Sequence, residues 1–202
     1  MNARNAVISG RNKNNKKRRK WKQIDNSFPV MKVALRVWIA EKFENPSVLD
    51  VYGGYGQMYR QVWQKYAANY CSTEGDALEW LKKKEVLDYD IYDIDPYASP
   101  YEAMILVAAK NTKNRIGIVA TDGTLRRQAL FYNTSFIHKY MCWDSKNKAM
   151  QGAIYHQYPN CLKAIINKIF GGEIKNMAVK SGKGFGKNGT SYFAVVIELN
   201  KK

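Results

Sequence analysis

A carboxylate, a proline and an aromatic ring follow one another at Asp95, Pro96 and Tyr97. The alternating segment 89–94 before them predicts a short strand. A proline has no amide hydrogen to donate, so Pro96 should end that strand and turn the chain. In open α/β sheets, ligands bind beyond the carboxyl ends of the strands. A bound molecule would therefore meet an acid, a carbonyl oxygen and a ring at this point.

Two neighbours extend this first group of candidate residues. Ser99 and Pro100 predict the start of a helix, with Ser99 as its N-cap and Pro100 at the first helical position. Ser99 is therefore a candidate substrate contact near Asp95. Asp93 lies two residues before Asp95 and should share its face of the strand, which makes Asp93 a second, less favoured candidate.

A glycine-rich turn carries the second group of candidate residues. Segment 48–52 predicts a buried strand, and Gly53, Gly54 and Gly56 lie between it and a helix expected over about 57–68. Such glycines let a ligand approach the backbone closely, but their spacing differs from the dinucleotide fingerprint. Asp50, at the end of the strand, suits a ligand with an ammonium and a sulfonium group better than a pyrophosphate. The turn therefore favours S-adenosylmethionine over NAD.

A short strand expected over 70–73 places two more acids near this turn. Glu74 or Asp76 could hold the ribose hydroxyls or the adenine amine of the cofactor, although Asp76 could equally cap the helix expected over 77–84. The predicted cofactor contacts are Asp50, Tyr52, Gly53, Gly54, Gly56, Glu74 and Asp76.

The remaining pattern predicts one α/β sheet. Helices are expected to about residue 43, over 101–111 and over 158–170, and a strand over 116–120 ends near Asp122. Strands over 174–180 and 191–199 flank a glycine-rich loop and predict an antiparallel hairpin at the C-terminal end of a mostly parallel sheet. Only about twenty residues separate the helix after the glycine turn from Tyr89, too few for two strand–helix steps. The fold should therefore be shortened over 66–89.

The charge balance indicates a polyanionic partner. The 202 residues hold 33 Lys and Arg against 17 Asp and Glu, a formal charge of +16, and such an excess favours nucleic acid. Residues 1–22 form a basic arm without acidic residues that is expected to be disordered, followed by one domain over 23–202. Aromatic and basic residues interleave over 124–150, as in proteins that stack bases and bind phosphates. The predicted substrate contacts are Ser99, Asp122, Arg126, Arg127, Lys183 and Lys187.

The cysteines and histidines offer no metal site. Three cysteines and two histidines are scattered along the chain without a ligand spacing. No apolar run reaches the ~18 residues of a membrane span. The sequence therefore predicts a soluble cytoplasmic protein that uses no metal and binds no membrane.

The Asp50–Gly56 turn and the strand order resemble the class I S-adenosylmethionine-dependent methyltransferases, which have a Rossmann-like fold. Within them, the segment DIDPYASP resembles the DPFGSP-type motif of the tRNA guanine 2-amino dimethyltransferases, with Ala98 in place of a glycine. That family continues with an ATDT-like segment, seen here at 120–124. Tyr52 lies where methyltransferases often have glycine.

The resemblance implies transfer of a methyl group to an exocyclic base amine, with RNA favoured over DNA. Asp95 and the Pro96 carbonyl would accept the two amine hydrogens and stabilise the developing positive charge, while Tyr97 stacks on the base. Three alternatives remain open: a DNA amino-methyltransferase, a methyltransferase for a small molecule or a protein, and a non-catalytic nucleic-acid-binding protein on a degenerate methyltransferase fold.

Overall fold

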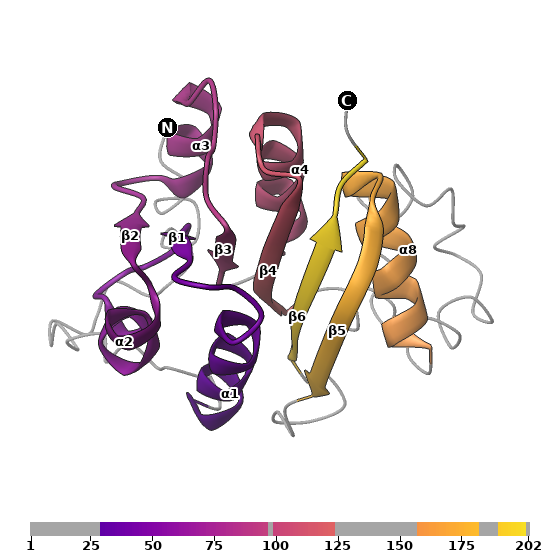
Figure 1. Ribbon diagram of the computed structural model, residues 1–202, viewed down its shortest axis with the longest axis horizontal. Coiled ribbons are helices and arrows are strands. Elements are labelled where there is room, and N and C mark those ends of the chain that lie inside the picture. Colours follow the sequence, from indigo (N-terminus) through magenta and orange to yellow (C-terminus); the bar gives the residue numbers. More distant parts are fainter. Residues whose placement is uncertain (1–28, 97–98, 124–156, 182–189, 201–202) are drawn as a thin grey trace, which may run out of the picture.

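Six strands form a single mixed sheet in the order β2-β1-β3-β4-β6-β5 (Figure 1). The computed structural model describes residues 29–96, 99–123, 157–181 and 190–200. The described strands are β1 (Ser47–Asp50), β2 (Asn69–Ser72), β3 (Ile91–Ile94), β4 (Arg115–Asp122), β5 (Glu173–Ser181) and β6 (Ser191–Glu198). The described helices are α1 (Pro29–Ala40), the π-helix η1 (Tyr59–Trp63), α2 (Gln64–Tyr66), α3 (Ala77–Lys83), α4 (Tyr101–Lys110) and α8 (Tyr158–Phe170).

Strand direction separates the sheet into two parts. Strands β2, β1, β3 and β4 pair in parallel, whereas β6 runs antiparallel to both β4 and β5. The carboxyl ends of the four parallel strands therefore meet at one edge of the sheet. The antiparallel pair β5–β6 is the expected C-terminal hairpin.

Helices cover both faces of the sheet and make three layers. One face packs against α3, α4 and α8 around Leu81, Met104 and Ile165. The opposite face packs against α1 and η1 around Ile39, Val62 and Trp63. Since neighbouring residues of a strand point to opposite faces, each strand contributes side chains to both cores. The near-continuous burial of β3, β4 and β6 follows from this double cover.

The predicted fold is confirmed, with small shifts at element ends. Helix α8 has the expected bounds, and Gly171 ends it in the left-handed conformation with φ of 66°. Between β2 and β3 the described chain holds only the short helix α3, as the shortened 66–89 segment required. Helix α4 begins one residue later than predicted, at Tyr101, with Pro100 and not Ser99 as its N-cap. The Ser99 hydroxyl still accepts a long hydrogen bond from the Tyr101 amide at 3.4 Å. No helix in the described ranges combines the length and apolar character needed to cross a bilayer.

Candidate active site

Three aspartates share one face of the sheet at the carboxyl ends of β1 and β3. Asp50 is paired with Asp93 across the parallel strands, and Asp95 follows two residues after Asp93. Period-two alternation puts all three side chains on the face that α1 covers. Burying three acids together is unfavourable unless cations accompany them. Helix α1 supplies these cations.

Arg36 of α1 binds Asp93 through two short hydrogen bonds. Its Nε and Nη2 atoms donate to Oδ2 and Oδ1 of Asp93, each at 2.6 Å. Trp63, from the π-helix, also donates its indole N–H to Asp93 Oδ2 at 2.8 Å. Arg36 is 1% exposed and Asp93 0%, so water screens this pair very little. Burial alone would lower the pKa of Arg36, but Asp93 and Asp95 outweigh burial and raise it.

Asp95 is held by a second cation from the same helix. Lys32 Nζ donates to Asp95 Oδ2 at 2.6 Å, and Arg36 Nη2 lies 3.5 Å from the same oxygen. Among the described residues, no hydrogen bond reaches Oδ1. Burial acts to raise the pKa of Asp95, but Arg36 and Lys32 together outweigh it and lower that pKa. Asp95 therefore remains an anion that can accept a further hydrogen bond.

Thr121 of β4 lies on this face beside Asp95. Its hydroxyl contributes to lowering the pKa of Asp95, yet it is buried without a hydrogen bond of good geometry to any described residue. A buried hydroxyl in this state is a site where a bound molecule can supply the missing partner.

Asp50 lies deeper, beneath the glycine turn. It is 2% exposed, and its Oδ2 accepts a hydrogen bond from the Tyr70 hydroxyl at 3.0 Å. A Cβ added at Gly53 would lie 3.0 Å from Ser72 Cβ and 3.2 Å from the Asp50 carboxyl, so a larger residue would have to displace these side chains by a few tenths of an ångström. Burial, together with the nearby charge of Asp93, raises the pKa of Asp50 to about 8. A cation bound near Asp50 would favour its ionised form.

The glycine turn leads directly into a helical segment whose middle is a π-helix. The amide of Gly56 donates to the Gly53 carbonyl at 2.8 Å, and Gly54 and Gly56 have positive φ angles of 51° and 70°. The chain then enters the π-helix before the short α2. The expected helix over 57–68 thus exists, but its middle is wider than an α-helix. Single π-helical turns inside α-helices occur frequently at functional sites. This one carries Trp63, whose indole N–H donates to Asp93.

The loop after β2 lies at the same edge of the sheet, because β1 and β2 are parallel. Glu74 and Asp76 are both exposed there. Asp76 caps α3, since its Oδ1 accepts from the amides of Leu78 and Glu79 at 3.0 and 3.1 Å. Glu74 keeps an exposed carboxylate at this edge. Tyr52, before the glycines, packs half-buried against the α3–α4–α8 core.

Asp122 lies apart from the three aspartates. It ends β4 on the opposite face of the sheet, where its Oδ2 accepts hydrogen bonds from the hydroxyls of Tyr101 and Tyr158 at 2.6 and 3.0 Å. It is 2% exposed. Burial and the Asp122 charge raise the pKa of both tyrosines, which remain protonated donors. The described contacts of Asp122 join β4 to α4 and α8 and do not place it beside Asp95.

Several predicted contacts lie outside the described residues. These are the catalytic candidate Tyr97, the substrate-binding candidates Arg126, Arg127, Lys183 and Lys187, and the basic arm 1–22.

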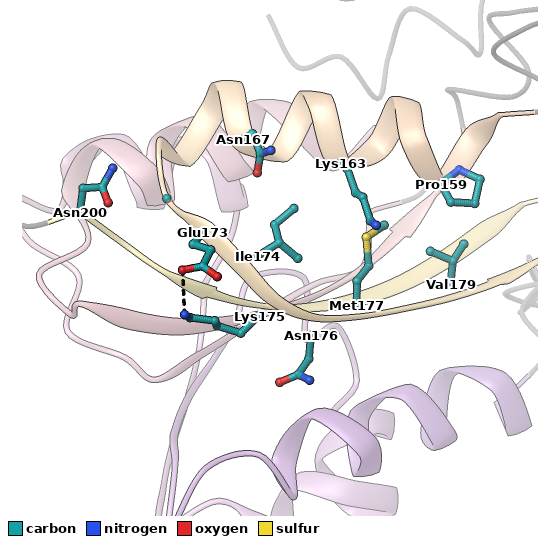
Figure 2. A pocket seen from close by; sticks show the side chains of 11 residues that line it. Pro159, Lys163, Asn167, Glu173, Ile174, Lys175, Asn176, Met177, Val179 and Asn200 are labelled. Carbon is teal, nitrogen blue, oxygen red and sulfur yellow. Dashed lines mark hydrogen bonds and ion pairs between the residues drawn. The ribbon is translucent and has the colours of Figure 1, made fainter.

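A concave surface elsewhere on the molecule is separate from these aspartates. It has a volume of about 850 Å³ and lies between α8 and the edge strand β5, lined by Lys163, Asn167, Ile174 and Met177 among others (Figure 2). Strands β4 and β6 separate β5 from β3 in the sheet. Lys175 within it is paired with Glu173 at 2.7 Å and Glu198 at 3.1 Å. We assign the chemistry to the three aspartates because they lie together at the carboxyl ends of the parallel strands β1 and β3.

The donor set at this edge fits an organic cation better than a metal ion. In the described part of the chain, no three Asp, Glu, His or Cys side chains form a group that could hold a metal. Asp50 supplies a carboxylate beneath the turn, the glycines supply an approachable backbone, and Glu74 supplies an exposed acceptor for hydroxyl groups. These residues suit a ligand that carries both positive charge and a sugar.

Sequence reasoning missed the cations of this site. Lys32 and Arg36 belong to a helix whose apolar face predicted only packing on the sheet. Trp63 belongs to the helix after the glycine turn, where no contact with an acid was predicted. A signal was present, because three acids in buried strands require cationic partners. Lys32 and Arg36 are spaced i, i+4 on α1, so they form one cationic stripe.

Comparison with known proteins supports the fold alone. No known family model matches the sequence, and no curated protein matches it. Among solved structures, yhhF from Escherichia coli, described as a methyltransferase, is 13% identical, with 87% of this chain and 88% of that chain covered and a TM-score of 0.50. A protein from Streptococcus thermophilus described as a hemolysin is 12% identical, with 85% and 66% covered and a TM-score of 0.51.

A third structure is TYW2 from M. jannaschii in complex with AdoMet. It is 14% identical, with 84% of this chain and 76% of that chain covered and a TM-score of 0.49. The strand order and the likeness to the yhhF structure together show a Rossmann-like α/β fold of six strands.

Proposed function

We propose that this protein is an S-adenosylmethionine-dependent methyltransferase that acts on an exocyclic amine of a nucleic-acid base, with RNA as its preferred substrate. One observation carries the proposal. An ionised, partly exposed carboxylate, Asp95, lies at the carboxyl end of a central parallel strand and is followed by Pro96. The glycine turn with Asp50 lies at the same edge, on the neighbouring strand. The fold shared with a described methyltransferase agrees with this function.

The substrate class follows from charge. An aromatic amine is neutral at physiological pH, whereas an aliphatic amine is protonated and would compete with Lys32 for Asp95. The formal charge of +16 favours a polyanion that carries such an aromatic amine. Nucleic-acid bases combine both properties. The resemblance of the DIDPYASP segment to the DPFGSP-type motif adds the preference for RNA.

The chemistry can be assigned to groups of this chain. S-adenosylmethionine supplies a methyl group on a sulfonium; transfer breaks the S–C bond, leaves its electron pair on sulfur and forms a C–N bond. Asp95 Oδ1 accepts one N–H of the amine, and the Pro96 carbonyl accepts the other, which directs the nitrogen lone pair toward the methyl group. Both acceptors stabilise the positive charge that develops on nitrogen. Because the pKa of Asp95 is lowered, Asp95 stays anionic until transfer, and the released proton passes to water.

Asp50, the glycine turn and Glu74 would hold the cofactor. Asp50 would attract the ammonium and sulfonium charges, Gly53 and Gly54 would allow close approach of the backbone, and Glu74 would accept hydrogen bonds from the ribose. Asp76 is the weaker candidate, since its Oδ1 already caps α3.

Calorimetry and labelled methyl transfer test the proposal together. We expect the protein to bind S-adenosylmethionine and to transfer a labelled methyl group to total RNA more readily than to DNA. Asp95→Ala should lower transfer about 10²- to 10³-fold while cofactor binding persists. Asp88→Ala is the matched control, because Asp88 is an exposed acid before the same strand whose side chain is 68% exposed. Full activity in Asp95→Ala would remove Asp95 from the reaction.

A non-catalytic nucleic-acid-binding protein is the second candidate. One observation favours it: Asp95 and Asp50 are both already engaged, by Lys32 and Tyr70. Absence of any heat of binding with S-adenosylmethionine, together with tight RNA binding, would favour this candidate over the enzyme.

A further inference from the structure

We propose that Lys32 is a positioning residue for Asp95: it fixes one carboxylate oxygen so that the other faces the target amine. This inference rests on the proposed function, because it assigns Lys32 a role in the same methyl transfer. Lys32 belongs to α1, a helix that precedes the glycine turn and holds none of the predicted site residues. The distance between Lys32 and Asp95 in the sequence is 63 residues.

The two carboxylate oxygens of Asp95 have different surroundings. Lys32 Nζ lies 2.6 Å from Oδ2, and Arg36 Nη2 lies 3.5 Å from the same atom. Among the described residues, Oδ1 accepts no hydrogen bond of good geometry, although the Thr121 hydroxyl lies beside Asp95. A carboxylate anchored at one oxygen loses rotational freedom about its last torsion, so the direction of its second oxygen is defined before substrate arrives.

Lys32 is itself fixed, which distinguishes it from a surface lysine. Its side chain is 12% exposed and that of Asp95 is 17% exposed. The Lys32 carbonyl accepts a hydrogen bond from Arg36 Nη1 at 3.1 Å, so the two cations of α1 are linked through the backbone. Arg36 is in turn fixed by its two hydrogen bonds to Asp93. Lys32 therefore lies on a rigid support.

Lys32 and Arg36 have different main partners among the charged groups around Asp95. Lys32 and Arg36 from α1 face it, together with Asp93 of its own strand, Asp50 of β1 and the Thr121 hydroxyl of β4. Arg36 has Asp93 as its main partner at 2.6 Å, whereas Asp95 is the acid paired with Lys32 among the described residues. Removal of Lys32 should therefore affect Asp95 selectively, while removal of Arg36 would disturb the whole cluster.

Lys32→Met, Lys32→Arg and a control, Lys83→Met, test the role of Lys32 in the full-length protein. Lys83 is an exposed lysine of α3, and methionine keeps the length of the side chain without its charge. Three quantities are measured in each protein: kcat and KM for methyl transfer to RNA across pH, the affinity for S-adenosylmethionine by calorimetry, and the titration of the Asp95 carboxyl carbon by NMR, assigned with Asp95→Asn.

We expect Lys32→Met to raise the pKa of Asp95 and to shift the acidic limb of the kcat profile to higher pH. kcat should fall roughly 10- to 100-fold, while the affinity for S-adenosylmethionine stays close to that of the parent. Lys32→Arg should restore most of kcat, because it restores the positive charge. Lys83→Met should match the parent in all three quantities.

The outcomes separate this inference from the proposed function. If the parent is active and Lys32→Met keeps its kcat, its pH profile and its Asp95 titration, Lys32 has no positioning role. If Lys32→Met loses cofactor affinity and kcat equally at every pH, Lys32 acts on the stability of the fold and not on Asp95. A parent that binds no S-adenosylmethionine and transfers no methyl group overturns the proposed function, and the role of Lys32 in that reaction with it.

Discussion

Arg36 joins a helix to a central strand through a fully buried charge pair. We predict that Arg36→Met lowers the free energy of unfolding by about 3–5 kcal/mol, because it leaves the Asp93 carboxylate buried without its cation. Arg36→Lys should recover little of this loss, since a lysine cannot donate two parallel hydrogen bonds. Urea denaturation measures both changes.

The double variant Arg36→Met/Asp93→Asn provides the control. Removing both charges should leave the protein more stable than Arg36→Met alone, because no unpaired charge remains and Trp63 can still donate to the amide oxygen. Strictly additive losses in the double variant would show that the two side chains are not coupled.

Asp50 should make the stability of the folded protein fall as pH rises. Its carboxyl has a pKa of about 8 in the folded protein against an ordinary value of 3.8. Between these values the folded protein keeps a proton that the unfolded chain has lost, so stability falls as pH rises through this range and levels off above about pH 8. We predict that the melting temperature of Asp50→Asn exceeds that of the parent by an amount that grows from pH 5 to about pH 8 and then levels off. A gap independent of pH would mean that Asp50 titrates normally.

Gly117 of β4 sets how closely α1 approaches the sheet. A Cβ at this position would lie 2.8 Å from Ile39 Cδ1 and 3.0 Å from Phe43 Cε2. We predict that Gly117→Ala costs about 1–3 kcal/mol of stability through overpacking, as measured by urea denaturation. Ile39→Val removes Cδ1, so the pair Gly117→Ala/Ile39→Val should recover part of the loss. Failure of this rescue would show that α1 does not pack on β4 in this way.

Helices and strands were predictable from the sequence where the apolar periodicity and a terminating glycine or proline indicated the same boundaries. Helix α8 has a periodic apolar face and a glycine after its last residue, and β3 ends at Ile94, two residues before Pro96. The π-helix was not predictable, because the same residues also fit an ordinary amphipathic helix. The Lys32–Asp95 and Arg36–Asp93 pairs were not predictable either, since their partners are 63 and 57 residues apart and only tertiary packing joins them.

The whole molecule combines a buried cluster of paired acids and cations with a strongly basic sequence. Positive charge is needed inside the site, where Lys32 and Arg36 balance acids, but two cations do not account for a formal charge of +16. Residues 1–22 carry nine Lys and Arg and no acid, which leaves about +7 for the rest of the chain. Both parts of the sequence can therefore attract a polyanion. Their contributions to RNA binding can be measured separately.

The salt dependence of RNA binding measures the share of the basic arm. Each cation that neutralises a phosphate of single-stranded nucleic acid adds about 0.7 to the slope of log K against log salt. We predict that changing Lys16, Lys17, Arg18, Arg19 and Lys20 to serine in the full-length protein lowers this slope by up to about 3.5. The control replaces Lys82, Lys83 and Lys84, an exposed cluster at the end of α3, and should change the slope less per charge removed. Fluorescence anisotropy with labelled RNA between low and moderate salt gives both slopes. An unchanged slope in the arm variant would assign the arm a role other than phosphate binding, because counterion release depends on charge and not on sequence.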